Sequence, residues 1–258
     1  METNQKISFV IVNYKSKKYL EKCIPLIIES AKNIEKEIIV VNTNDTLILS
    51  DDIKLINISE NKGFGSACNL GVKTASGNIL CFINPDTEII SNDFEKIISE
   101  FEKDSKIGII GPKLVDKNNN IQEWISGKEI ILSEVILNNL GLKRSKKIWE
   151  SKERIECAWV SGASMFIRKE LFEKLKGFDE NFFMYFEDVD LCRRVRNLGY
   201  KILYYPEFII KHFGGKSFDS KKEQQELYYK SQDYYFQKHF GKIKVNLLKL
   251  IRMIVIIK

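Results

Sequence analysis

The sequence predicts an α/β fold built on a largely parallel, doubly wound sheet. Apolar runs of strand length alternate with helix-length segments through residues 1–90, in the order strand, helix, strand, strand, helix, strand. Polar clusters end three of these runs, and the carboxyl ends of parallel strands meet at one edge of a sheet. Ligands bind outside that edge in open α/β sheets, so these clusters supply the candidate site residues.

Continuous β-branched and apolar runs predict the strands, and apolar residues three or four positions apart predict the helices. Strands are expected to stop at Pro112 and at Pro206, because proline cannot donate to a sheet ladder. The expected strands are 7–12, 37–41, 53–58, 79–83, 107–110, 157–160, 165–167, 200–205 and 208–210, and the expected helices are 17–32, 64–76, 91–106, 169–175, one that begins near 187, and two within 219–258.

The strand expected at 79–83 is the centre of the chain's organisation. All five of its residues are apolar, as in a strand buried on both faces, and it stops at Asn84, Pro85 and Asp86. That stop projects Asp86 from the carboxyl-end edge of the sheet. Asn-Pro-Asp is also ordinary turn chemistry, so the tripeptide alone favours a surface turn.

Two other strands end in polar residues at the same edge. Asn13 and Tyr14 follow the first strand, and Asn42 follows the second. An aromatic ring beside an amide suits a flat heterocycle such as a nucleobase. Taken alone, Asn13 and Tyr14 fit a plain strand-end turn better.

Two segments rich in small residues indicate close approach of the backbone to a ligand. Gly63 and Gly65 flank Phe64 ahead of a helix, whose N-terminus can face an anion. This is not the G-x-G-x-x-G fingerprint, so by itself it is a weak signal. Residues 161–164, which include Gly162, separate two expected strands in the same way.

A cluster of carboxylates follows a dense group of aromatic residues. Glu187, Asp188 and Asp190 come directly after the aromatic run that ends at Phe186. Carboxylates beside apolar bulk are costly, which points to chemistry. Acidic residues also favour a helix N-terminus, and Asp190 with Arg194 four residues on is typical of a structural pair, which leaves Glu187 and Asp188 as candidates for chemistry.

His212 ends an apolar run beside two glycines. An isolated histidine is most often structural, but Asp86 would need a partner to hold a metal ion. Mixed imidazole and carboxylate ligation favours Mn²⁺ or Mg²⁺ over Ca²⁺.

The basic charge is concentrated at the C-terminal end. Residues 211–258 carry a local charge of +7, whereas residues 1–210 sum to −1. The last 14 residues are mostly apolar and too few to span a bilayer, which needs about 20. They fit an interfacial membrane helix or a helix docked on the body or on a second subunit.

Cysteine usage and the N-terminus bear on the compartment. The five cysteines are scattered singly, which is typical of reduced thiols in the cytoplasm. The N-terminal residues show no signal-peptide pattern, so we expect a cytoplasmic protein, with the inner face of the plasma membrane as its place of work.

With these motifs in place, the chain resembles the family 2 glycosyltransferases, and within them the bacterial rhamnosyltransferase-like branch. The resemblance covers about residues 6–240. Its motifs are 10–14, 61–71, the Asn84-Pro85-Asp86 form of the family's D-x-D motif, and 186–193 followed by 212–217.

The resemblance implies a GT-A fold and inverting transfer of a sugar, rhamnose or a related hexose, from a nucleotide-diphosphate donor such as a dTDP- or UDP-sugar. The acceptor would be a hydroxyl of a growing cell-surface glycan on a lipid carrier, with no nucleic acid involved and a homodimer left open. Residues 1–112 would form the nucleotide-sugar-binding half of a 1–218 catalytic domain, and 113–218 the acceptor half. The basic, apolar-ended composition of the tail at 219–258 separately suggests peripheral membrane contact and a lipid-carried acceptor. The implied roles are Asn13, Tyr14 and Asn42 for the base, Lys62, Gly63 and Asn69 for the donor, Asn84, Gly162 and Glu187 for substrate, Asp86 and His212 for Mn²⁺ or Mg²⁺, and Asp188 as general base.

The chain departs from the family pattern at one position, and two other functions are considered. Asn42 stands where the family usually has Asp, so donor affinity or base preference is expected to differ, since an amide lacks the carboxylate's charge. Asn42 also motivates a catalytically silent nucleotide-sugar-binding subunit of a glycan-assembly complex. A nucleotidyltransferase is disfavoured because no basic phosphate loop follows the first strand.

Overall fold

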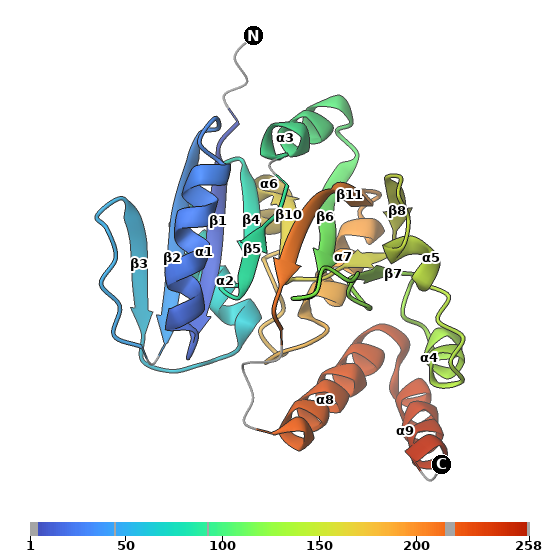
Figure 1. Cartoon of the computed structure of the whole chain (residues 1–258). Coiled ribbons are helices and arrows are strands. Elements are labelled where there is room, and N and C mark those ends of the chain that lie inside the picture. The colour runs from blue at the N-terminus through green and yellow to red at the C-terminus, as the bar shows by residue number, and fades with distance from the viewer. Residues whose placement is uncertain (1–4, 44, 92, 215–219, 257–258) are drawn as a thin grey trace.

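A nine-stranded mixed sheet runs through the computed structural model, which describes residues 5–43, 45–91, 93–214 and 220–256 (Figure 1). The strand order is β3-β2-β1-β4-β10-β6-β11-β5, with β8 paired to β11. The main-sheet strands are β1 Ile7–Tyr14, β2 Lys36–Thr43, β3 Ile53–Ile58, β4 Ile79–Ile83, β5 Thr87–Ile89, β6 Ile107–Val115, β8 Ile155–Cys157, β10 Ser164–Arg168 and β11 Lys201–His212, and β7 Ser126–Gly127 pairs with β9 Trp159–Val160. The helices are α1 Lys17–Ser30, α2 Phe64–Val72, α3 Phe94–Lys103, α4 Leu132–Asn139, α5 Lys146–Trp149, α6 Lys169–Lys174, α7 Glu187–Asn197, α8 Lys221–Phe240 and α9 Lys242–Ile256.

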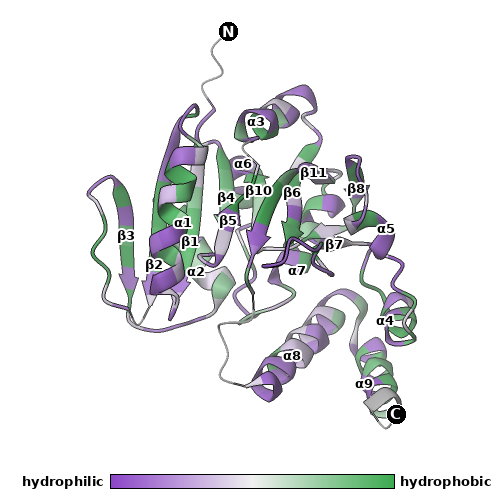
Figure 2. Cartoon of the chain, viewed as in Figure 1, coloured by the Kyte–Doolittle hydropathy of each residue, from purple (hydrophilic) through white to green (hydrophobic). Residues whose placement is uncertain are grey.

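The predicted doubly wound α/β sheet is confirmed. Strands β3, β2, β1 and β4 are parallel, whereas β10 runs antiparallel to both β4 and β6. Side chains alternate across β1, so Phe9 packs against Phe94 of α3 while Val10 faces Gly71 of α2. Apolar strands therefore lie between helical layers, with α1 and α3 on one face and α2, α6 and α7 on the other (Figures 1 and 2).

Two strands pass through prolines, and the predicted stops at Pro112 and Pro206 are wrong. β6 continues to Val115, and Pro112 lies beyond the two residues of β6 that pair with β10. β11 continues to His212 because a register shift between Tyr205 and Ile209 interrupts its pairing with β6 where Pro206 falls. Pro112 therefore has no partner on the β10 side, and Pro206 falls where the pairing with β6 is interrupted.

The 113–154 segment is more ordered than its sequence pattern indicates. Residues 117–120 have the sequence Lys-Asn-Asn-Asn, which predicts a hairpin tip, and they form one, with Val115 bridged to Ile121 and the Asp116 amide bonded to the Asn120 carbonyl at 2.8 Å. The apolar stretch at 130–140 forms α4. This segment runs along the carboxyl-end edge of the sheet and supplies part of the site.

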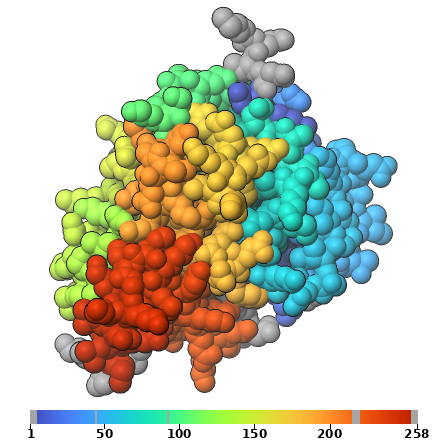
Figure 3. Space-filling model, turned by 180° about the vertical axis from the view of Figure 1, so that it is seen from behind, coloured from blue at the N-terminus to red at the C-terminus, as the bar shows by residue number. Residues whose placement is uncertain are grey.

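The C-terminal helices pack on the rest of the chain. Tyr235 and Phe236 of α8 and Val245 and Leu248 of α9 are buried, so one face of each helix is docked, as one of the two expectations for the tail proposed. From behind, the red surface of α9 is continuous with the orange and yellow surface of the body (Figure 3). Among the described residues, no helix combines the length and apolarity needed to cross a bilayer.

Candidate active site

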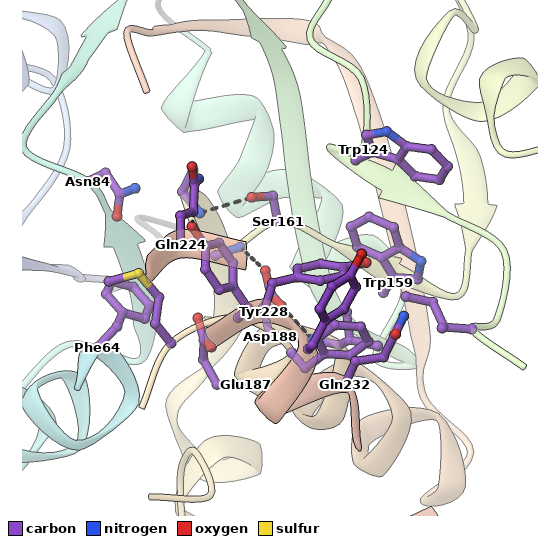
Figure 4. A pocket seen from close by; sticks show the side chains of 18 of the residues that line it. Phe64, Asn84, Trp124, Trp159, Ser161, Glu187, Asp188, Gln224, Tyr228 and Gln232 are labelled. Atoms are coloured by element: carbon purple, nitrogen blue, oxygen red, sulfur yellow. Dashed lines mark hydrogen bonds between the residues drawn. The ribbon is translucent and has the colours of Figure 1, made fainter. Parts of the chain in front are cut away.

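A cavity of about 760 Å³ lies where the carboxyl ends of the strands meet α4 and α8 (Figure 4). It is lined by residues from most of the segments that the sequence singled out, including Asp86, Gly162, Asp188 and His212. These residues come from four separate parts of the chain. Positions 86, 188 and 212, which are far apart along the chain, therefore lie at one cavity.

Strand pairing brings Asp86 and His212 together. β5 follows Asp86 directly and pairs antiparallel with the end of β11, where Thr87 lies opposite His212. The Phe213 amide donates to the Asp86 carbonyl oxygen at 3.0 Å. His212 Nε2 then lies 3.4 Å from Asp86 Oδ1 and 3.4 Å from Asn84 Nδ2.

The other ring nitrogen of His212 is held by Gln122, a residue that the sequence did not single out. Gln122 Nε2 donates to the His212 carbonyl oxygen at 2.6 Å, which fixes the orientation of the amide because a carbonyl can only accept. Gln122 Oε1 is then 3.0 Å from Nδ1 and accepts its proton. In this arrangement Nε2 keeps a lone pair and points toward Asp86.

The donor set of this pair fits a divalent cation. Two cis ligands of an octahedral ion at about 2.1 Å lie about 3 Å apart, close to the 3.4 Å between Nε2 and Oδ1. Within the part of the chain that the structure describes, no group of three or more His, Cys, Asp or Glu is suitably arranged for a metal. Two protein ligands with the remainder from substrate phosphate is the usual arrangement for Mg²⁺-type ions.

Asp188 lies in the first turn of α7, with each oxygen fixed by a backbone amide. Gly162 N donates to Oδ2 and Val189 N donates to Oδ1, both at 2.8 Å. A Cβ added at Gly162 would approach Asp188 Cβ and Phe64 to 3.4 Å, so the small residue allows the 161–164 turn to lie against the carboxylate. The sequence predicts close approach of the backbone to a ligand there, and the structure shows the turn against the Asp188 side chain.

The segment that leads into α7 is strained. Tyr185 and Phe186 have φ of 67° and 66°, a region that bulky residues rarely adopt. Helix α8 holds this segment in place, since Gln224 Nε2 donates to the Tyr185 hydroxyl at 2.8 Å and Ser231 donates to the Met184 carbonyl at 2.6 Å. Strain of this kind concentrates at functional sites and persists only where neighbours enforce it.

Both carboxyls at the start of α7 have shifted pKa values. Burial, and then the charge of Asp188, raise the pKa of Glu187 well above its ordinary value. Burial also raises the pKa of Asp188, against the amides of Gly162 and Val189 that lower it. Glu187 Oε2 has no hydrogen-bond partner among the described residues, and its carboxyl lines the cavity. Glu187 is therefore the neutral member of the pair when Asp188 is ionised.

Asn13 and Asn42 are buried at the carboxyl ends of β1 and β2 and do not line this cavity. Tyr14 does line it, because neighbours on a strand face opposite sides of the sheet. The parallel register sets Asn13 opposite Asn42, and Asn13 Nδ2 donates to Asn42 Oδ1 and to Asp45 Oδ2, each at 2.8 Å. Asn42 in turn donates to Asn57 Oδ1 at 2.7 Å. Asp45 thus places a carboxylate beside the position where Asn42 lacks one.

Lys62, Gly63 and Asn69 also lie outside the main cavity. Lys62 lines a smaller hollow of about 470 Å³. Gly63 has φ of 98°, and a Cβ there would collide with the Phe183 backbone. The Asn69 amide bonds both the carbonyl and the N–H of Phe178, at 2.9 and 2.8 Å, so it joins α2 to the segment before α7.

Several cavity residues had little or no signal in the sequence. The wall away from the metal pair is aromatic and amide-rich, with residues from the 113–154 segment, from β9 and from α8. These are Trp124, Trp159, Gln224, Tyr228, Tyr229 and Gln232. The tyrosines of α8 stand out in the sequence as aromatic, but their distance from Asp188 along the chain hides their place in the site. Residues 215–217 of the expected 212–217 motif, and Asn44 after the second strand, lie outside the described residues.

Known protein sequences resemble this chain over most of its length. The sequence model of the family described as Glycosyl transferase family 2 matches residues 8–176. The chain is 27% identical over 232 residues to the rhamnosyltransferase WbbL of Escherichia coli K12, covering 83% of this chain and 87% of that protein. It is 24% identical over 180 residues to the N-acetylglucosaminyl-diphospho-decaprenol L-rhamnosyltransferase of Mycobacterium tuberculosis, covering 62% and 59%. It is 23% identical over 224 residues to the dTDP-rhamnosyl transferase RfbF of Shigella flexneri, covering 83% and 71%.

Solved structures show the same fold. GalNAc-T7, solved with UDP, GalNAc and Mn²⁺, superposes with a TM-score of 0.65 at 15% identity, covering 99% of this chain and 55% of that one. The mannosyltransferase PcManGT from Pyrobaculum calidifontis, in complex with GDP-Man and Mn²⁺, gives 0.61 at 16% identity, covering 92% and 64%. The chain thus spans less than two thirds of either structure, and at these identities the likeness shows the fold alone, which is the GT-A fold.

Proposed function

Because the chain belongs to glycosyl transferase family 2, we propose that it transfers rhamnose or a related hexose from a nucleotide-diphosphate donor to a hydroxyl of a growing cell-surface glycan. The observation that carries this proposal is the shared cavity, which brings the Asp86–His212 pair and the Asp188 carboxylate together from distant parts of the chain. The Asp86–His212 pair suits a cation bound to a diphosphate, and the Asp188 carboxylate suits an acceptor hydroxyl.

The donor end of the cavity is proposed to lie at the sheet edge. Asp86 and His212 would hold Mn²⁺ or Mg²⁺, with Asn84 beside them. A bound divalent ion there would stabilise negative charge on the departing nucleotide diphosphate. The nucleobase would lie near Tyr14, above the buried amides of Asn13 and Asn42. The Asp45 carboxylate on that network supports base recognition despite Asn42.

The role proposed for Asp188 is that of general base. Its oxygens are fixed by two backbone amides, so the carboxylate is oriented before substrate arrives. An acceptor hydroxyl bound against it would lose its proton to Asp188 while the oxygen attacks the anomeric carbon. Attack from the face opposite the leaving group inverts the configuration in a single displacement. Glu187, neutral beside it, would donate a hydrogen bond to substrate.

The acceptor is proposed to occupy the aromatic wall between α4 and α8. Trp159 and Tyr228 line this part of the cavity, and Lys128 and Arg252 are the basic side chains among its described lining residues. Aromatic faces suit sugar rings, and cations suit a diphosphate. A relative named for a diphospho-decaprenol acceptor supports a lipid carrier here, with transfer at the cytoplasmic face of the membrane.

The test is a donor panel of dTDP-, UDP- and GDP-sugars, with and without Mn²⁺, that measures both binding and donor hydrolysis or transfer. We expect turnover of one donor class, increased by Mn²⁺. Binding without turnover on every donor and a broad acceptor panel would support the silent-subunit alternative instead. The absence of both binding and turnover would overturn the proposed function.

A further inference from the structure

Two segments far apart in the chain expose apolar side chains at the same end of the molecule. Helix α9 packs against α4, and both lie below the sheet in Figures 1 and 2, where each shows hydrophobic residues. Six apolar side chains in the loop after α4 and in α9 are between 45% and 84% exposed: Leu140, Leu142, Ile243, Leu247, Leu250 and Met253. We call these six residues, together with Lys147, Lys242 and Lys244, the basic apolar face.

Helix α9 is apolar on two sides, only one of which the body uses. Val245 and Leu248 are buried against the body. Ile243, Leu247 and Leu250 follow one another at helical spacing on the exposed side. A surface helix normally carries polar residues on its outer side, so this second apolar stripe marks an interaction surface.

The two segments that carry this surface are basic, although five of their Lys and Arg residues pair with nearby carboxylates. Residues 140–149 and 242–253 contain eight Lys and Arg and no Asp or Glu. Lys143, for example, pairs with Glu123. Lys147, Lys242 and Lys244 are exposed and have no ion pair with a described carboxylate.

The basic apolar face adjoins residues that line the cavity. Asn138 and Asn139, at the end of α4, and Arg252 of α9 line the cavity and also flank the face. A surface that touched this face would therefore lie beside the acceptor end of the site. This step depends on the proposed function, in which that end receives a lipid-linked glycan.

We propose that the basic apolar face docks on an anionic lipid bilayer. Exposed leucines and isoleucines interleaved with lysines suit the boundary between acyl chains and negative headgroups. A second copy of this chain is disfavoured, because a twofold interface would set the same lysines against one another. Docking in this position would present the cavity mouth to an acceptor that stays anchored in the membrane.

Sedimentation with vesicles tests the proposal without any donor or acceptor present. We expect binding to phosphatidylcholine vesicles that contain phosphatidylglycerol, weak binding to phosphatidylcholine alone, and loss of binding as salt is raised. Leu247→Ser with Leu250→Ser, and separately Leu140→Ser with Leu142→Ser, should each reduce binding at least tenfold. Ile48→Ser, at a fully exposed position elsewhere, is the matched control and should have no effect.

Charge reversal tests the electrostatic contribution to vesicle binding. Lys147→Glu, Lys242→Glu and Lys244→Glu together should abolish the preference for anionic vesicles, whereas Lys22→Glu, Lys106→Glu and Lys174→Glu should leave it intact. Equal binding to neutral and anionic vesicles, no binding to either, or a dimer in light scattering that the Leu247→Ser, Leu250→Ser variant dissociates would overturn the proposal. Donor hydrolysis measured on the same preparations without vesicles separates failure of docking from failure of the proposed function.

Discussion

Gln122 contacts His212 with both polar atoms of its amide, one on the backbone carbonyl at 2.6 Å and one on ring Nδ1 at 3.0 Å. The contact of Asn84 Nδ2 with His212 Nε2, at 3.4 Å, agrees with a proton on Nδ1, because an amide nitrogen can only donate. The pair therefore sets the tautomer that the proposed metal site requires.

Removal of Gln122 should weaken metal binding without removing a ligand. We expect Gln122→Ala to lower Mn²⁺ affinity about 10- to 100-fold in the presence of a nucleoside diphosphate, as loss of a partner that orients a metal-bound histidine usually does. The amount of free Mn²⁺ measured by electron paramagnetic resonance reports this directly. Asn118→Ala, in the exposed turn of the same hairpin, is the control. Unchanged affinity in Gln122→Ala would contradict the role of Gln122.

Substitution of Asp188 should separate binding from transfer. Asp188→Asn keeps the shape of the side chain but removes the proton acceptor, so we expect kcat to fall about 10²- to 10⁴-fold. Donor affinity, measured by calorimetry, should stay within about twofold because Asp188 is placed on the acceptor side. A variant with full activity would refute the assignment of Asp188 as the base.

The pH profile should report the buried carboxyl pair. Since burial raises the pKa of Asp188 above the ordinary value of 3.8, kcat should fall on the acid side at a pH above that value. Glu187→Gln should leave this acid limb in place, because Glu187 is already neutral when Asp188 ionises. An acid limb displaced by more than about one pH unit in Glu187→Gln would show that Glu187 carries charge in the active enzyme.

We expect Asp190 to stabilise the fold, as its spacing from Arg194 indicates. Its fully buried carboxylate is bonded by Arg194, Lys238 and His239 at 2.6–2.7 Å, which joins α7 to α8. Burial alone would raise its pKa, but these partners outweigh burial and hold the pKa below its ordinary value. The stabilisation is thus present above the unfolded pKa of about 3.9 and is lost as pH falls through the lower, folded pKa.

Asp190→Asn should leave Arg194 without its carboxylate partner and lower the free energy of unfolding by about 3–5 kcal/mol at neutral pH. Urea denaturation measures the change. Glu29→Gln, which breaks an exposed pair with Lys32, should have almost no effect. Equal effects of the two substitutions would contradict the structural role of the Asp190 cluster.

The sequence predicts those parts of the fold that depend on local pattern. Apolar runs mark β1, β2, β3 and β4 closely, and the stop after β4 places Asp86 at the edge where the cavity lies. Asp188 is found because carboxylates beside aromatic bulk are unusual. Strand direction is harder, since nothing in the residues of β10 tells an antiparallel from a parallel neighbour.

Features that depend on distant pairing escape prediction. Pro112 and Pro206 lie inside strands because of where neighbours stop or shift register, which local pattern does not encode. Gln122 lies in a weakly patterned segment and gains its role only when β6 and β11 pair. Asn13 lies at the carboxyl end of β1, where the sequence predicts a site residue. Side chains alternate along β1, however, so Asn13 does not reach the cavity that Tyr14 lines.

The pairing of β5 with β11 determines when, during synthesis of the chain, the site can form. Asp86 and His212 are separated by 126 positions, so a nascent chain can lay down β1 to β4 long before His212 leaves the ribosome. Such an intermediate holds only one of the two proposed metal ligands. Capacity to bind the ion should consequently appear late in synthesis, as a mark of the completed sheet.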